Sequence, residues 1–454
     1  MTTRQAAPRL RIAAIELKER DVRLRLPFRF GVVTLTESPQ AFARVRIRLE
    51  DGRESQGAAA ELLAPKWFDK DPALSNEDNY EQLRRSLAVA RDAYLAHEAR
   101  TAWDHASPAR GLVENYGPAL LDRAVLDALC RALGVSFYRA VQANFVGAGS
   151  FEGIDLGAYC ASLQPRVSIA ARHTVGLVDP ITAADQKQRV GDGLPETLEE
   201  VVARYGQRYF KLKVAGDARA DVERLVAIAA VLDRIAGPYH VSLDGNEQYE
   251  DMQGVVELWA RMKGEVRLAR LVSSVLFIEQ PVKRQKALAS PVRDIDRPVI
   301  IDESDDALDA FPRAKALGYR GVSSKTCKGL YKSLLNGARC AAWGEGYFMS
   351  GEDLTIQAGL ALQQDLALVS LLGLTHVERN GHHYVNGMAG LPPGEQDAFL
   401  AAHPDLYERS HGAVRVKISE GMLDIGSLDC PGYASRAMPD WDSMREIKPQ
   451  RESA

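Results

Sequence analysis

The chain has 454 residues, of which 46% are hydrophobic and 26% charged, and its formal net charge is −4. This composition suffices for a large buried core divided over two or three domains. The near-neutral balance excludes a strongly basic nucleic-acid or membrane-surface binder. No run reaches the roughly 18 apolar residues of a membrane span, the start lacks a signal peptide, and the five cysteines form no CxxC pair. We therefore expect a cytoplasmic protein with no nucleic-acid or membrane partner.

The first 150 residues are predicted to form an α+β unit. Residues 10–50 alternate between apolar and polar side chains, which is typical of antiparallel strands with one exposed face. Asp51-Gly52 predicts a turn between two such strands. Apolar loops are expected at residues 27–31 and 64–68. Helical spacing follows at residues 78–104 and 117–134.

Residues 151–390 predict a (β/α) barrel. Short apolar runs alternate there with helical stretches, and eight such repeats close most naturally into a barrel. The expected strands are 171–177, 208–213, 239–244, 275–279, 298–302, 321–325, 346–350 and 374–378. The expected helices are 195–205, 219–234, 253–269, 285–290, 307–317, 330–342 and 355–371.

The periodicity stops after Gly390-Leu391-Pro392-Pro393-Gly394. Residues 391–454 are expected to contain a helix and an extended stretch at 413–418, and to return to the N-terminal unit. The polar residues 437–454 are predicted to be a mobile tail.

Five of the predicted barrel strands end in charged residues. In chain order these ends carry Lys211 and Lys213, then Asp244, Glu279, Asp302 and Lys325. The carboxyl ends of parallel strands are where such barrels keep their chemistry. Three carboxylates at one mouth repel each other unless a cation lies between them. An all-oxygen ligand set favours a hard divalent ion, here Mg²⁺.

A single acidic residue at such a position is as readily explained by a helix cap or a surface ion pair. Three on successive strand ends are harder to explain in that way. Asn246 follows Asp244 closely and could orient a ligand. Glu303 either shares the metal or points away, since neighbouring strand residues face opposite sides; Asp302 is the preferred ligand.

The lysines are candidates for proton transfer. Lys211 and Lys213 are two residues apart on one strand and face the same side. Two ammonium groups inside a barrel are costly unless they are neutralised or functional, and crowding lowers a lysine pKa towards that of a base. Lys325 arrives from the opposite side of the barrel. Lys328 and Lys332 are interpreted as surface lysines.

These motifs resemble the enolase superfamily, and within it the muconate-lactonizing-enzyme-like subgroup. Lys211-x-Lys213, Asp244-x-Asn246, Glu279-Gln280-Pro281, Asp302-Glu303-Ser304 and Lys325 occur in that subgroup's order. The resemblance implies a modified seven- or eight-stranded barrel with an N-terminal α+β capping domain that the C-terminal segment completes. It also implies that Lys213 and Lys325 are the acid/base pair with Lys211 in support. One Mg²⁺ per subunit, or Mn²⁺ in its place, would be bound by Asp244, Glu279 and Asp302.

The resemblance further implies that the loops at residues 28–31, which include Phe30, and near Trp67 close over the substrate and help set specificity. Dipeptide epimerases of the subgroup are expected to carry Asp-x-Asp on the last strand, whereas this chain has Glu378-Arg379-Asn380. An α-amino substrate is therefore doubtful, although Glu352, Asp353 and Glu378 could contact one. His376, His382 and His383 are interpreted as polar residues of the barrel mouth rather than as a second metal site. Cys327 is interpreted as a small packing residue.

The sequence thus predicts magnesium-dependent removal of the proton α to a carboxylate, giving a metal-stabilised enediolate. Racemisation or epimerisation and syn-dehydration of a small carboxylic acid are the leading outcomes. A muconate-type cycloisomerase is an alternative. A metal-free lyase that forms a Schiff base at Lys213 or Lys325, and a barrel that only binds its ligand, are alternatives of other classes. The resemblance is compatible with a homo-oligomer, although no stretch indicates an interface.

Overall fold

The N-terminal part of the molecule is an antiparallel sheet. The structure, a computed structural model, describes residues 6–354 and 357–448. Strands β1 (Leu10–Phe30), β2 (Val33–Leu49) and β3 (Glu54–Leu62) are joined by β17 (Arg445–Glu446) in the order β17-β1-β2-β3. The alternating pattern and the turn at Asp51-Gly52 are confirmed. The expected loop at residues 27–31 is wrong, because Phe28 pairs with Leu35 and prolongs the hairpin to its turn.

Helices cover one face of this sheet. They are α1 (Asn76–Ala96) and α3 (Leu112–Leu133), and the shorter α2 (Ala102–His105) and α4 (Phe137–Gln142) pack against α3. A capping box between Ser75 and Asp78 starts α1. The single helix expected over 78–104 is interrupted after Ala96, because Arg100 leaves it to exchange backbone hydrogen bonds with Leu10.

Gly57 allows α3 to lie directly on β3. A Cβ at this position would be 2.1 Å from the backbone nitrogen of Ala128, so any side chain would push the helix off the sheet. The close approach fixes the sheet against the helix that faces the barrel.

The rest of the described chain is dominated by a closed barrel of eight parallel strands, as predicted. Its strands are β6 (Ser168–Val175), β7 (Tyr209–Lys213), β8 (His240–Asp244), β9 (Val275–Glu279), β10 (Val299–Ile301), β11 (Gly321–Ser324), β12 (Phe348–Gly351) and β13 (His376–Glu378). Each pairs with the next, and β13 pairs with β6 to close the ring. The small hairpin strands β4 (Ser150–Phe151) and β5 (Ile154–Asp155) precede it.

Helices alternate with these strands. They are α5 (Leu156–Ser162), α6 (Leu198–Tyr205), α7 (Ala218–Leu232), α8 (Met252–Gly264), α9 (Ala269–Ser273), α10 (Arg284–Ala287), α11 (Ala310–Ala316), α12 (Leu330–Trp343) and α13 (Leu360–Leu371). Short 3-10 turns η1 (Ala183–Asp185), η2 (Val266–Leu268) and η3 (Thr326–Lys328) lie between them. The helix expected over 355–371 begins at Leu360, and residues 355–356 lie outside the described part. No helix among the described residues is long and apolar enough to cross a membrane.

The C-terminal segment returns to the N-terminal sheet, as expected. It contains α14 (Pro393–Ala402), β14 (Tyr407–Ser410), β15 (Ala413–Val416), β16 (Met422–Asp424), η4 (Gly426–Leu428) and η5 (Trp441–Ser443). Strand β16 adds antiparallel to the barrel strand β6. The predicted mobile tail is wrong for residues 437–448, because β17 pairs with β1 and the Trp441 ring packs on Phe42; residues 449–454 lie outside the described part.

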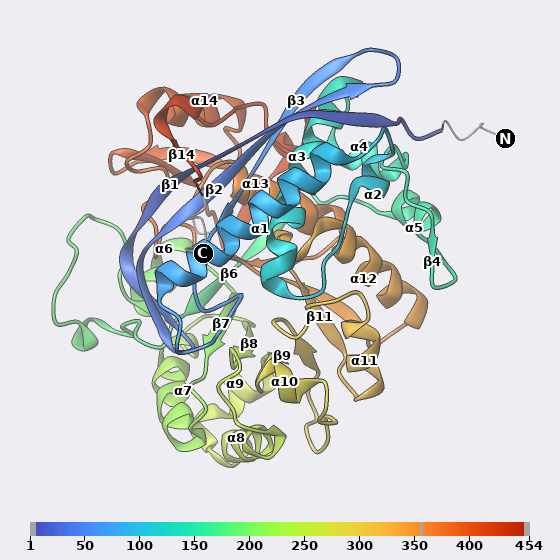
Figure 1. Cartoon of the computed structure of the whole chain (residues 1–454). Coiled ribbons are helices and arrows are strands. Elements are labelled where there is room, and N and C mark those ends of the chain that lie inside the picture. Colours follow the sequence, from blue (N-terminus) through green and yellow to red (C-terminus); the bar gives the residue numbers. More distant parts are fainter. Residues whose placement is uncertain (1–5, 355–356, 449–454) are drawn as a thin grey trace.

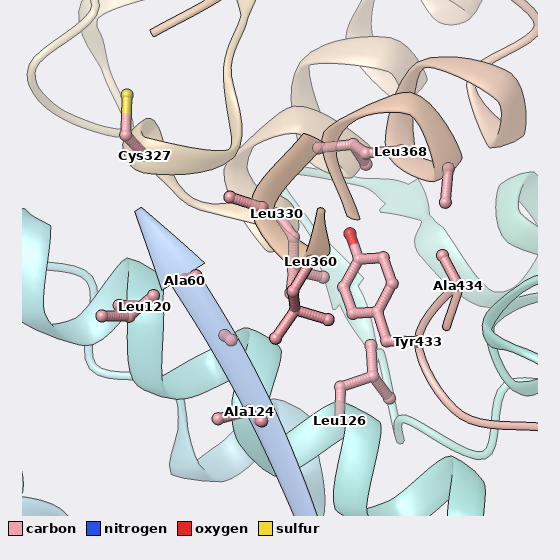
Figure 2. Close-up of a cluster of buried hydrophobic side chains, with 14 of the residues drawn as sticks. Ala60, Leu120, Ala124, Leu126, Cys327, Leu330, Leu360, Leu368, Tyr433 and Ala434 are labelled. Atoms are coloured by element: carbon pink, nitrogen blue, oxygen red, sulfur yellow. The ribbon is translucent and has the colours of Figure 1, made fainter. Parts of the chain in front are cut away.

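The sheet-and-helix part, which we call the cap, shares a hydrophobic core with one side of the barrel, and the other barrel strands and helices form a second cluster. Figure 2 shows Leu120, Ala124 and Leu126 of α3 facing Leu330, Leu360 and Leu368 of the barrel helices. Cys327 is 2% exposed in the same cluster, as expected of a packing residue. The domain limits at residues 150 and 390 stay predictions, since this core is continuous across both parts.

Candidate active site

The charged strand ends lie together at one mouth of the barrel. Across the sheet, Lys213 of β7 is level with Asp244 of β8, and Asp244 is level with Glu279 of β9. Asp302 and Lys325 follow β10 and β11. Lys211, Lys213, Asp244, Glu279, Asp302 and Lys325 are all at most 6% exposed. The structure therefore turns all six inward, and the cost of burial must be met by mutual pairing.

Lys211 lies at the centre of a cage of carboxylates. Its Nζ is 2.9 Å from Asp244 Oδ2, 2.8 Å from Glu279 Oε2, 2.6 Å from Glu352 Oε2 and 3.1 Å from Glu378 Oε2. Burial opposes the charged ammonium, but these four acids outweigh it and hold the Lys211 pKa well above its usual value. Lys211 is a fixed positive charge that ties four strand ends together.

Lys213 occupies one side of this cage. Its Nζ is 2.5 Å from Asp244 Oδ2 and donates a hydrogen bond of 2.6 Å to Asn246 Oδ1. Burial raises the pKa of Asp244, but the positive charges of Lys211 and Lys213 lower it by more. The pKa therefore lies below its usual value, and this carboxyl is ionised. Lys213 thus shares its acidic partner with a second lysine and faces a neutral amide.

Lys325 occupies the other side. Its ammonium pairs with Asp302 Oδ2 and lies 4.5 Å from the centre of the Trp67 ring. Burial opposes the charge of Lys325, but Asp302 outweighs it and raises the pKa. The cap therefore reaches the site at Trp67, which is 2% exposed and whose Nε1 has no hydrogen-bond partner among the described residues.

Lys328 and Lys332 are not surface residues, which corrects the sequence-based interpretation. They are 1% and 7% exposed. Lys328 Nζ lies 3.3 Å from Asp302 Oδ1 and from Asp305 Oδ2, and donates a hydrogen bond of 2.8 Å to Ser323 Oγ. The turn η3 brings Lys328 back under Asp302 instead of pointing it to solvent. Asp302 is therefore held by lysines on both oxygens, and its pKa lies well below the usual value although burial opposes this.

The three predicted metal ligands fit a divalent ion in kind. Asp244, Glu279 and Asp302 are fully buried carboxylates. Both Glu279 oxygens lack a hydrogen-bond partner among the described residues, although one is in ionic contact with Lys211. Burial, with Asp244 and Glu352 adding to it, raises the Glu279 pKa well above its usual value, so this acid gains most from a further cation. In the conformations described, however, the side chains turn to lysines, and no three acidic, histidine or cysteine side chains of residues 6–354 and 357–448 are arranged to hold an ion.

Other predicted site residues lie around this set. Glu303 Oε1 accepts hydrogen bonds from Asn246 Nδ2 at 3.2 Å and from Lys70 Nζ at 3.1 Å, away from Asp302. Glu352 pairs with Arg172 as well as Lys211. Asp353 pairs with Arg379 at 2.6 Å, and its backbone nitrogen donates a hydrogen bond of 3.1 Å to Glu378 Oε2. Glu352 and Glu378 thus belong to the cage, whereas Glu303 and Asp353 border it.

Comparison with known proteins agrees with this architecture. A profile described as enolase C-terminal domain-like matches residues 193–417. A magnesium-bound enolase superfamily member from Roseovarius nubinhibens is 17% identical, with 97% of this chain and 99% of that chain covered and a TM-score of 0.58. Residues 193–417 of this chain therefore belong to the enolase C-terminal domain-like family. The solved structures share the fold of the whole chain.

Two further structures share the fold across the superfamily. An N-succinyl Arg/Lys racemase from Bacillus cereus is 16% identical, with 81% and 87% of the two chains covered and a TM-score of 0.57. The L-Ala-D/L-Glu epimerase from Bacillus subtilis is 16% identical, with 94% and 99% covered and a TM-score of 0.57. At this identity the likeness carries the fold only. No curated protein matches the chain.

Sequence reasoning assigned no role to two residues that support this site. Gln280 Oε1 accepts hydrogen bonds from the backbone nitrogens of Asp302 and Ser304, at 2.9 and 3.0 Å, and so links the ends of β9 and β10. Arg284 donates to the carbonyl oxygens of Trp67 and Phe68, both at 2.8 Å, and so anchors the cap loop on the barrel. The only sequence signal for Gln280 was its place beside Glu279.

The backbone is strained at the same strand ends. Asn246, Glu247 and Gln280 have φ values of 40°, 69° and 31°, in the left-handed region that side chains other than glycine rarely adopt. Such residues concentrate at functional sites, where surrounding contacts hold them in place. Here the hydrogen bonds of Asn246 and Gln280 supply those contacts.

His382 and His383 follow the carboxyl end of β13, at the barrel mouth as interpreted, whereas His376 begins β13 at the opposite end of the barrel and corrects that interpretation. His173 lies on the outer face of β6, and the centre of its ring is 5.0 Å from the centre of the His383 ring. The His382 ring contacts the Tyr205 ring. Burial lowers the pKa of His173 and of His382 to about 3 in each case. His376 stacks on Tyr209 and is separate from both. His173 and His382 are therefore uncharged structural residues.

Proposed function

We propose that the protein removes the proton α to the carboxylate of a small carboxylic acid, with one Mg²⁺ held by Asp244, Glu279 and Asp302. The observation that carries the proposal is the presence of two buried ammonium groups on opposite sides of one set of carboxylates. Lys213 is paired with Asp244, and Lys325 is paired with Asp302. A barrel that only bound its ligand would not need a proton carrier on each side.

The roles of the chain's own residues follow from their surroundings. Lys213, beside a shared carboxylate and a neutral amide, is the group assigned to take the proton. Lys325 holds its proton firmly through Asp302 and is assigned to deliver one to the opposite face. The Trp67 ring lies against Lys325, and its buried indole N–H has no acceptor among the described residues. A substrate oxygen beside Lys325 could accept this hydrogen bond, which supports the assignment. When bound, the metal would offset the negative charge that grows on the substrate carboxylate, which is worth several kcal/mol.

The raised pKa of Lys325 argues against the Schiff-base alternative at that residue. A lysine must be neutral to attack a carbonyl, and Asp302 keeps Lys325 charged. Racemisation or epimerisation uses a lysine on each face, and syn-dehydration begins with the same proton removal. A muconate-type cycloisomerisation would instead form the enediolate by ring closure and then need a lysine to protonate it. The first step is therefore common to the outcomes that we favour.

The test is hydrogen exchange. The protein is incubated in deuterated water with MgCl₂ and a panel of acid sugars, dipeptides and N-acyl amino acids, and deuterium at the α-carbon is followed by NMR. We expect exchange in at least one substrate class and its loss on adding chelator. Exchange that persists in chelator would contradict the metal requirement. Borohydride trapping of a protein–substrate adduct would instead support the lyase.

A further inference from the structure

A small cavity adjoins the charged centre on the side of the cap. It has a volume of about 40 Å³ and lies between the β1–β2 hairpin and the ends of β12 and β13. Phe28, Phe30 and Leu62 line it from the cap, and Leu354, Tyr384 and Val385 line it from the barrel. Its walls are thus mainly aromatic and aliphatic, which suits an apolar occupant.

The cavity is one side chain away from the lysines. Glu378 forms part of its wall, and Glu378 Oε2 is the oxygen that lies 3.1 Å from Lys211 Nζ. Glu378 is therefore shared by the cavity and the lysine cluster, so the cavity is the adjoining space on the cap side for the remainder of a molecule whose carboxylate lies at the cluster.

The charged groups of the wall are already engaged. Arg379 pairs with Asp353 at 2.6 Å and also with Asp365. Glu378 Oε1 accepts a hydrogen bond of 2.6 Å from Thr174 Oγ1. Asn380 exchanges hydrogen bonds of 2.9 and 3.0 Å with the backbone of Thr174. A second charge on the ligand would lose its hydration and find these partners occupied, which is costly.

We propose that this cavity selects a monocarboxylate with a short, uncharged alkyl substituent. The proposal rests on the proposed function, because it places the substrate carboxylate at the lysine cluster. The small volume limits the substituent to a short chain. This substrate class differs from those of the N-succinyl Arg/Lys racemase and the L-Ala-D/L-Glu epimerase, whose names include charged amino acids.

Phe28 sets the size limit. Its ring lies 4.2 Å from Tyr384 and 5.2 Å from Phe30, measured between centres, and closes the cavity at the hairpin end. The side chain is only half-buried, so shortening it opens the cavity outward without removing the centre of the hydrophobic core.

The test is the binding of straight-chain carboxylates from acetate to heptanoate, measured by calorimetry with MgCl₂ present. Each methylene that enters the cavity should improve Kd about fourfold, and the gain should stop at a short chain. Glutarate and 5-aminopentanoate, which add a charge at the far end, should bind at least about tenfold more weakly than pentanoate. Phe28→Ala should extend the gain by several carbons, whereas Phe151→Ala, a matched change outside the cavity, should leave the series unchanged.

Two results would overturn the proposal. One is tighter binding of either doubly charged acid than of pentanoate. The other is an unchanged chain-length profile in Phe28→Ala. Since binding is measured without turnover, a normal series together with no α-deuterium exchange would sink the proposed function and leave the binding preference standing. Exchange of α-deuterium without any chain-length selectivity would contradict the binding preference and leave the proposed function standing.

Discussion

Two buried polar regions of this molecule behave in opposite ways. In the lysine–carboxylate cluster at the barrel mouth (Lys211, Lys213, Lys325 and their acids), opposite charges raise the pKa of Lys211 and Lys325 and lower that of Asp244 and Asp302, so these four groups stay charged. The histidine cluster behind β6 (His173, His382 and His383) contains two imidazoles whose pKa burial lowers to about 3. Both regions are almost completely hidden from solvent. The difference shows that burial alone removes charge, and that a partner of opposite charge within about 3 Å preserves it.

In the lysine–carboxylate cluster, removing a proposed metal ligand should have the largest effect, which is a loss of Mg²⁺ affinity. Glu279→Gln deletes the acid whose oxygens lack hydrogen bonds, and we expect Mg²⁺ affinity to fall at least about 100-fold by calorimetry. Glu352→Gln removes an acid that also contacts Lys211 but is not a proposed ligand, and should cost less than about tenfold. Equal losses in the two variants would show that overall charge, not ligation, governs the metal.

Unpairing the cluster tests whether its charges depend on one another. Lys328→Met takes one of two buried lysine partners from each of Asp302 and Asp305, which keep Lys325 and Lys332 respectively. It should lower the free energy of unfolding by about 3–5 kcal/mol in urea titrations. The exposed Lys286→Met is the matched control and should change it by less than about 0.5 kcal/mol. A stable Lys328→Met protein would mean that the neighbouring lysines suffice.

Acid should act on the histidine cluster. His173 and His382 have a pKa of about 3 in the fold and an ordinary pKa of 6.5 when unfolded. The unfolded state therefore binds more protons between these values, so stability is complete above pH 6.5 and is lost as the pH falls towards 3. The loss should approach about 1.4 kcal/mol per pH unit for each histidine. His173→Gln should reduce this slope, and an unchanged slope would show that His173 is not buried as a neutral ring.

A pair of buried serines gives the smallest and cleanest contrast. Ser323 Oγ donates to Asp302 Oδ1, whereas Ser242 Oγ has no partner among the described residues. Ser323→Ala should cost about 1.5–3 kcal/mol, the usual contribution of a hydrogen bond to a charged group. Ser242→Ala should be nearly neutral in the same thermal or urea denaturation. Similar losses of stability in both variants would show that the hydrogen bond from Ser323 to Asp302 contributes nothing beyond the loss of a buried hydroxyl.

Much of the fold was predictable because its signals are local. Apolar runs that end at Asp244 or Glu279 mark strands whatever their neighbours are, and the alternation before Asp51 marks the cap sheet. The position of Lys328 was not predictable, because it depends on how η3 turns after β11. The role of Arg284 depends on the cap loop, whose carbonyl oxygens at Trp67 and Phe68 meet it only in three dimensions. Residues 437–448 were wrongly predicted to be mobile for the same reason, because β17 is held in place by pairing with the edge of β1, which is far away in the sequence.

The site was predictable as a set of residue types but not as a set of contacts. The pattern of strand ends indicated Lys211 as a supporting lysine, yet no pattern shows that four acids from four strands surround it. Glu352 and Glu378 were named only as residues that could contact an α-amino substrate, and the structure places both against Lys211. Long-range pairing of this kind depends on barrel closure.

The most direct test of the account is α-deuterium exchange of each enantiomer of an accepted carboxylic acid, with Lys213→Ala and Lys325→Ala beside the unmodified protein. If the two lysines serve opposite faces, each variant should lose exchange of one enantiomer by about 10²–10⁴-fold and retain it for the other, while an exposed-lysine variant such as Lys283→Ala keeps both. Full exchange of both enantiomers in either variant would contradict the assignment of a proton carrier to each side of the carboxylates.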